Sequence, residues 1–306
     1  MRRAAIGVAA AACAVVSTAS SASAPVTYRG LNGRIAFARY SSLGNPPQLF
    51  AMSATGSAQK QLLHHDGEDA EPSWAPDGRR LVFTSVTAGN VQGIFVTTRS
   101  GVLERLTAHV YDPQSPLLDA HARWSPDGKR IVFHRYKRTG SELYVVNADG
   151  SGLRKIGDGF EPAWSPDGRR IVFAYLTPGT TNYDIYAMNA DGSGRRQLTN
   201  TSEPDNDPDW SPDGQRIAFV SHRDGNYEIY TMRADGTQQR RLTYIAAEDY
   251  SPVWSPDGKR IVFTSRRLEA QWDIYVMRAD GSNQTRLTTS RDDESQPSWQ
   301  SLPRQR

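Results

Sequence analysis

The chain has 306 residues, a hydrophobic fraction of 38% and a formal net charge of +3. This length is sufficient for a buried core, in one large domain or two ordinary ones. Its 36 basic and 33 acidic side chains alternate along the chain without a basic stripe, which excludes nucleic-acid binding driven by global charge. Strand-forming residues together with 25 Gly and 18 Pro predict an all-β chain with many turns.

The first residues predict a secretory signal peptide over 1–24. A charged start precedes an apolar run at 4–16 and small residues up to Ala24. Cleavage is expected near 22–24; Ala22-Ser23-Ala24 fits but places Pro25 beside the cut, so the earlier Ser20-Ser21-Ala22 remains open. The apolar run is shorter than the roughly 20 residues that cross a bilayer. We therefore expect an exported protein without a transmembrane segment, periplasmic or extracellular according to the host envelope.

The single cysteine, Cys13, lies inside this signal. After cleavage no cysteine remains, so disulfides and thiolate metal sites are excluded.

One unit of sequence recurs along the rest of the chain. Trp-Ser-Pro-Asp-Gly occurs four times and Trp-Ala-Pro-Asp-Gly once, and a last Trp begins a truncated copy. Successive Trp residues are 50, 40, 46, 44 and 45 positions apart, a period typical of four-stranded propeller blades. The six repeat anchors are Trp74, Trp124, Trp164, Trp210, Trp254 and Trp299.

Each copy predicts four short strands. Trp ends the first strand and packs between neighbouring sheets. The Pro-Asp-Gly turn then closes a hairpin, because Pro presets its first torsion and Gly accepts a positive φ. Runs such as Arg-Ile-Val-Phe at 260–263 and Asp-Ile-Tyr at 273–275 predict the buried second and third strands. After an Ala-Asp-Gly turn, Arg-Leu-Thr at 286–288 predicts a brief edge strand.

The strand types are out of phase at the two ends of the chain. The first complete element is a second strand at 34–37, and the last is a first strand at 296–300. Pairing these ends in one composite blade leaves no inner strand unpaired. The sequence therefore predicts a single all-β, six-bladed β-propeller over 32–300 with four-stranded antiparallel blades, after a linker at 25–31 and before a tail at 301–306.

The repeat resembles the WD-repeat-like units of the TolB-like propeller family. The resemblance rests on Trp-Ser-Pro-Asp-Gly-Lys-Arg-Ile-Val-Phe at 254–263 and Asp-Ile-Tyr-Val-Met-Arg-Ala-Asp-Gly-Ser at 273–282, and it extends over residues 30–300. Propellers attached to prolyl-oligopeptidase-type and tricorn-type peptidases carry similar units. TolB proper has an α/β domain before its propeller, and only about ten residues separate the signal from the first blade here. The resemblance implies the fold more safely than the function.

Sequence variation predicts where binding takes place. In an up-and-down blade the two tight turns lie on one face of the ring. The interblade connections and the loop after the second strand lie together on the opposite face. The tight turns hardly vary between copies, so we expect binding specificity on the second, variable face. Its aromatic candidates are Tyr111, Tyr136, Tyr183, Tyr227 and Trp272. Tyr111 belongs to an insertion at 108–118, for which a partner contact and a neutral surface loop both remain open.

An acidic residue stands five positions before most of the Trp anchors. In one copy that position is Gly159, with an acid beside it. If the innermost strands line the channel, these carboxylates form a ring at its mouth, which could attract a cation or the basic tail of a partner. The competing and compatible interpretation is that each acid caps a turn. The set is Asp69, Asp119, Asp158, Asp205, Asp249 and Glu294.

The sequence contains no nucleophile elbow, His-Glu-x-x-His motif, phosphate-binding loop or Cys cluster. We therefore expect no catalytic residues and no cofactor, and assign no metal ligands. The main hypothesis is an exported, monomeric binding or scaffold protein that engages a protein or cell-envelope partner. The alternative is a propeller-fold polysaccharide lyase or hydrolase that uses channel-mouth acids, Asp119 among them, with His121 and a metal.

Overall fold

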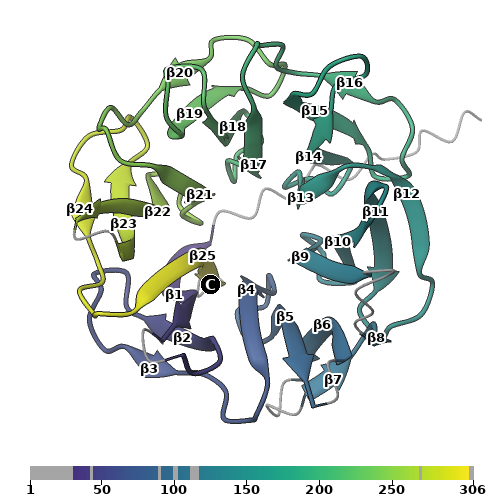
Figure 1. Cartoon of the computed structure of the whole chain (residues 1–306), viewed down its shortest axis with the longest axis vertical. Coiled ribbons are helices and arrows are strands. Elements are labelled where there is room, and N and C mark those ends of the chain that lie inside the picture. The colour runs from purple at the N-terminus through teal and green to yellow at the C-terminus, as the bar shows by residue number, and fades with distance from the viewer. Residues whose placement is uncertain are drawn as a thin grey trace, which may run out of the picture.

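The computed structural model of the chain describes residues 30–41, 44–88, 91–98, 103–110, 117–268 and 271–302. Six antiparallel sheets surround a central channel, each with its first strand innermost (Figure 1). The predicted six-bladed, all-β propeller is therefore confirmed. The predicted signal peptide and most of the predicted linker lie outside the described residues.

The blades are numbered from the one that holds the first strand. Blade 1 contains β25 (Asp293–Leu302), β1 (Leu31–Tyr40), β2 (Gln48–Met52) and β3 (Lys60–Gln61). Blade 2 contains β4 (Glu68–Trp74), β5 (Leu81–Thr87), β6 (Val91–Thr97) and β7 (Leu103–Arg105), and β8 (His109–Val110) also pairs with β6. Blade 3 contains β9 (Leu118–Trp124), β10 (Arg130–Lys137), β11 (Gly140–Asn147) and β12 (Arg154–Asp158).

The remaining blades have the same order of strands. Blade 4 contains β13 (Phe160–Trp164), β14 (Arg170–Leu176), β15 (Tyr183–Asn189) and β16 (Arg196–Gln197). Blade 5 contains β17 (Asp205–Trp210), β18 (Arg216–Ser221), β19 (Glu228–Arg233) and β20 (Arg240–Arg241). Blade 6 contains β21 (Asp249–Trp254), β22 (Arg260–Leu268), β23 (Gln271–Arg278) and β24 (Thr285–Arg286).

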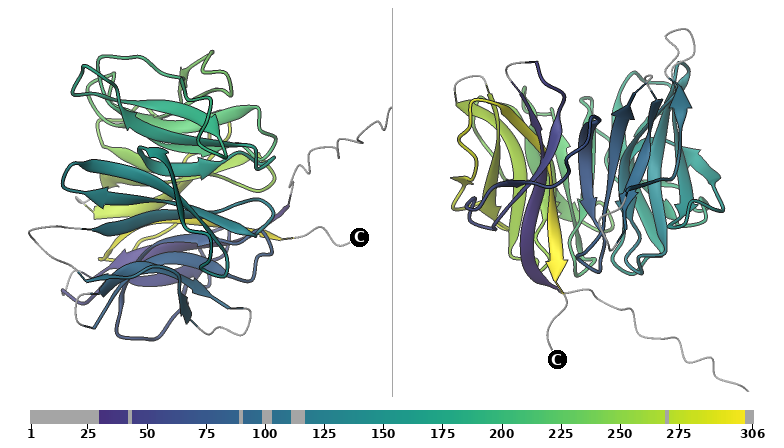
Figure 2. Two further views of the ribbon diagram at one scale, coloured as in Figure 1. Left: turned by 90° about the vertical axis from the view of Figure 1, so that its right-hand side faces the viewer. Right: turned by 90° about the horizontal axis from the view of Figure 1, so that it is seen from below.

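The ring closes in blade 1, as the phase of the repeats predicts. The yellow β25 lies beside the purple β1 (Figure 2), and the two strands pair from Leu31 with Leu302 to Tyr40 with Asp293. The pairing extends slightly further than predicted, to residues 31 and 302 instead of 32 and 300, because Ser301 and Leu302 continue the ladder.

The edge strands are shorter than predicted for a local reason. Leu287 and Thr288 are predicted to belong to the edge strand of blade 6, and Leu242 and Thr243 are their equivalents in blade 5, but β24 ends at Arg286 and β20 at Arg241. The hydroxyl of Thr243 accepts a hydrogen bond from the N–H of Ile229 at 2.9 Å, in place of a backbone carbonyl. Thr288 does the same for Ile274 in blade 6. A side chain thus completes the ladder after the backbone has turned away.

The Trp anchors lie between blades. Trp210 packs with Val172 and Ile185 of blade 4 and with Ile217 of its own blade. Five anchors also lie under an arginine of the preceding blade, at 4.5–5.1 Å from guanidinium carbon to ring centroid. These pairs are Arg80 with Trp124, Arg130 with Trp164, Arg170 with Trp210, Arg216 with Trp254 and Arg260 with Trp299.

No helix among the described residues has the length and apolar character needed to cross a membrane.

Candidate binding cavity and central channel

Each innermost strand contains a β-bulge at the same place. The register with the second strand shifts there in all six blades, and the residue three positions before Trp adopts a φ of 49–56°. This left-handed conformation is uncommon for a residue with a side chain. The six residues are Glu71, His121, Glu161, Asp207, Ser251 and Gln296.

The bulge residues connect neighbouring blades. The N–H of His121 donates to Glu71 Oε2 at 2.7 Å, that of Asp207 to Glu161 Oε2 at 2.8 Å and that of Ser251 to Asp207 Oδ2 at 3.1 Å. Glu71 N–H likewise donates to Gln296 Oε1. A side chain of one blade therefore satisfies a backbone donor that the bulge frees in the next blade.

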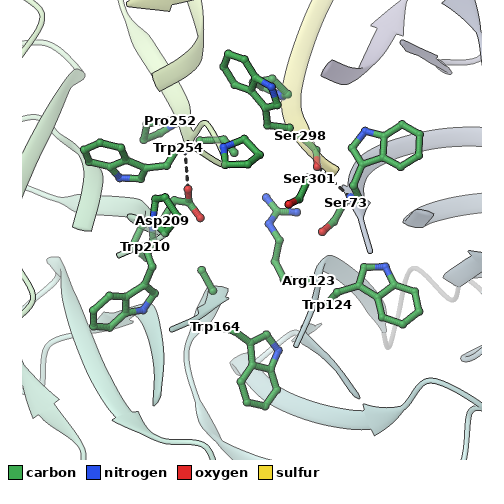
Figure 3. A pocket seen from close by; sticks show the side chains of 18 of the residues that line it. Ser73, Arg123, Trp124, Trp164, Asp209, Trp210, Pro252, Trp254, Ser298 and Ser301 are labelled. Carbon is green, nitrogen blue, oxygen red and sulfur yellow. Dashed lines mark hydrogen bonds between the residues drawn. The ribbon is translucent and has the colours of Figure 1, made fainter. Parts of the chain in front are cut away.

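The floor of the channel is a cavity of about 240 Å³, here called the channel cavity, lined by the six Trp anchors and by polar side chains. Arg123 and Asp209 face its centre (Figure 3). Asp209 accepts a hydrogen bond from the N–H of Trp254 at 2.8 Å. Burial raises the pKa of Asp209 to about 6, against the opposing effects of that hydrogen bond and of Arg123.

The predicted acidic ring does not line the channel. Asp69, Asp119, Asp205, Asp249 and Glu294 have no exposed surface. Asp158 differs, because it ends β12 with a side chain that is 53% exposed and paired with Lys155 at 2.7 Å. The channel-mouth location is thus wrong for the five buried residues, and Asp158 lies on the outermost strand of its blade.

Four of the five buried carboxylates are held by an arginine of their own blade, and Asp69 is held by a histidine of the connection that precedes its blade. Arg135 binds both oxygens of Asp119, at 2.7 and 3.0 Å, and His65 occupies the corresponding place beside Asp69 at 2.9 Å. The other pairs are Arg39 with Glu294, Arg223 with Asp205 and Arg267 with Asp249. The arginines also stack on aromatic rings, as Arg135 does on Tyr144. These contacts stabilise the blade, and they differ from the backbone caps expected as the alternative.

A second cavity, here called the variable-face cavity, has a volume of about 920 Å³ and is formed mainly by blades 3 and 4. Three of the predicted aromatic residues, Tyr136, Tyr183 and Tyr227, line it together with Phe160. Tyr136 is 46% exposed and Tyr183 is 40% exposed, and Phe160 meets Tyr183 edge-on at 4.9 Å between ring centroids. Aromatic residues from separate copies of the repeat thus line one cavity.

The charges at the rim of this cavity compensate one another. Lys137 and Lys155 both pair with Glu142, the latter at 2.8 Å. Burial opposes ionisation of Glu142, but the hydrogen bonds from the two lysines outweigh it and lower the pKa of Glu142 to about 2. The rim therefore presents paired charges beside the aromatic surface.

Of the other two aromatic candidates, Trp272 does not line this cavity. Trp272 packs against Tyr250 at 5.6 Å between ring centroids, and Tyr250 packs against Tyr227. Tyr111 lies outside the described residues. From its insertion, His109 joins blade 2 through β8 and contacts Asp119 at 3.0 Å.

The enzyme alternative required Asp119 and His121 to act together. Asp119 is buried against Arg135, whereas His121 lines both cavities. The structure therefore does not bring this pair together at the channel.

Ligand atoms of His121, Glu161 and Asp207 instead lie within 4.8 Å of one another. Burial, together with the charge of Asp207, raises the pKa of Glu161 well above its ordinary value. We did not predict this group from the sequence. Its signal is present, since the position three residues before Trp is polar in all six copies.

Known propeller proteins resemble this chain in sequence and in fold. The model of the TolB beta propeller domain matches residues 110–303. TolB from Acinetobacter baumannii is 22% identical, with a TM-score of 0.77 over 88% of this chain and 66% of its own. A putative TolB from Agrobacterium tumefaciens is also 22% identical, with a TM-score of 0.64 over 85% of this chain and 89% of its own.

A more distant structure is an oligogalacturonate lyase in complex with manganese. It is 17% identical, with a TM-score of 0.55 over 79% of this chain and 70% of its own. A comparison with curated protein sequences gives no match. Structural similarity at identities this low shows a shared fold alone.

Proposed function

Since the chain belongs to the TolB beta propeller domain family, we propose that it is an exported, non-catalytic binding protein that engages a protein or cell-envelope ligand at the variable-face cavity. Export rests on the predicted signal at 1–24. The binding role accords with the family and with the aromatic surface between blades 3 and 4.

The convergence of aromatic side chains is the observation that carries this proposal. Tyr136, Phe160, Tyr183 and Tyr227 come from three blades and line one hollow of about 920 Å³. Tyrosine supplies a large contact area at a small entropic cost and is enriched at the centres of protein interfaces. The paired charges of Lys137, Glu142 and Lys155 at the rim suit a polar border around an apolar centre.

The test is capture of partners from envelope extracts of the source cells with the tagged protein, followed by affinity measurement. For a partner bound at this cavity, Tyr183→Ala and Tyr136→Ala should each weaken binding at least about tenfold, the effect of losing a central aromatic contact.

A matched control is Tyr244→Ala. Tyr244 is 67% exposed, more than either cavity tyrosine, and does not line the cavity. This variant should bind like the wild type. If both cavity variants bind every captured partner as tightly as the wild type, the cavity is not the binding site.

A further inference from the structure

Three neighbouring blades each direct one potential metal ligand into the channel. His121, Glu161 and Asp207 occupy the bulge position of β9, β13 and β17, with φ values of 49–51°. Their ligand atoms lie within 4.8 Å of one another. Neighbouring ligands of a tetrahedral metal with bonds of about 2.1 Å are about 3.4 Å apart. Rotation of these side chains that brings their ligand atoms closer by at most about 1.4 Å would therefore produce a coordination geometry.

The surroundings orient the imidazole. Glu71 Oε1 lies 3.3 Å from Nδ1 of His121, the arrangement in which a carboxylate fixes the ring of a metal-bound histidine. The ring of His134 stacks on that of His121 at 5.2 Å between centroids. His121 is thus held from two sides.

The local charge favours a cation. Glu161 and Asp207 both line the channel cavity, and their carboxylates repel one another. A divalent ion between them would relieve this repulsion. The backbone hydrogen bonds to these two residues each use one carboxylate oxygen, and each carboxylate has two.

We propose that His121, Glu161 and Asp207 bind a first-row divalent transition metal, Zn²⁺ or Mn²⁺, in the central channel. Imidazole favours such ions over Ca²⁺ and Mg²⁺, which prefer ligand sets made of oxygen alone. Three protein ligands leave at least one position open to water or another ligand. Because His121 and Glu161 line both cavities, the ion would be accessible from the variable-face cavity.

The experiment is calorimetric titration of the purified, EDTA-treated protein with ZnCl₂, MnCl₂ and CaCl₂, with Co²⁺ absorption as a direct report on coordination. The wild type should bind one Zn²⁺ or Mn²⁺ per chain, and Ca²⁺ at least tenfold more weakly. Asp207→Asn and His121→Gln should each weaken binding of the transition metal at least tenfold and remove the Co²⁺ ligand-field bands.

Asp209→Asn is the matched control, since Asp209 lines the same cavity and lies outside the triad. It should change the affinity less than threefold. Asn at 207 keeps an acceptor for the N–H of Ser251, and thermal unfolding without metal identifies any variant that has lost its fold. Equal binding of Ca²⁺ and Zn²⁺, an equal loss in Asp209→Asn, or wild-type affinity in both triad variants would overturn the proposal.

Discussion

Arginines at the end of the second strand, or just after it, determine how the buried carboxylates behave. Asp249 has no exposed surface, and Arg267 lies 2.8 Å from it with a side chain that is 14% exposed. Burial raises the pKa of Asp249, and Arg267 counteracts this effect. A carboxylate in this environment stabilises the fold only while its partner is present.

Asp249→Ala should therefore lower the free energy of unfolding by about 3 kcal/mol, because it leaves the Arg267 guanidinium without its buried partner. Asp158→Ala is the control, since the 53% exposed Asp158 side chain forms a surface pair with Lys155. It should cost less than about 1 kcal/mol. Urea unfolding measures both, and equal losses in the two variants would contradict the structural role of Asp249.

At the scale of the strand, the bulge turns side chains towards the channel. A regular strand would place residues five, three and one positions before Trp on the same face. The register shift between Tyr250 and Val253 interrupts this alternation in blade 6, and Ser251 adopts a φ of 51°. As a result the residue five positions before Trp is buried in the blade, while the residue three positions before it lines the channel.

Substitutions at Ser251 test this conformation. Ser251→Gly should leave the free energy of unfolding within about 1 kcal/mol of the wild-type value. Gly adopts a positive φ readily, and this relief of strain offsets the lost contact between the Ser251 hydroxyl and Asp207. Ser251→Val should lower it by at least about 2 kcal/mol, since a β-branched residue strongly resists this conformation.

Urea unfolding of the two Ser251 variants provides the comparison. If Val is tolerated as well as Gly, the left-handed bulge in β21 is not present in solution.

At the scale of the whole molecule, the end of the chain completes the ring. Trp299 packs with Ile35 and Phe37 of blade 1 and with Val262 and Ile274 of blade 6. β25 also pairs with the inner edge of β1. Both the interblade packing and the backbone pairing of blade 1 therefore depend on β25.

Removing residues 295–306 should abolish cooperative thermal unfolding, because it exposes the edge of β1 and opens the core between blades 6 and 1. A synthetic peptide of residues 291–306, added in trans, should restore the transition by replacing β25. Circular dichroism in the aromatic region measures both states. A truncated chain that unfolds at the wild-type temperature would show that closure does not stabilise the ring.

The sequence by itself determined the number of blades, their strand order and the closure, because each copy carries its own turn and core residues and their phase defines how the ends meet. It also indicated the face on which Tyr136, Tyr183 and Tyr227 converge. Only the tertiary structure showed that Asp119 and its equivalents are paired with basic side chains inside the blades, and that His121, Glu161 and Asp207 meet in the channel. The physical reason is that a bulge changes the direction of side chains without a fixed residue type, and that contacts between blades join residues more than 40 positions apart.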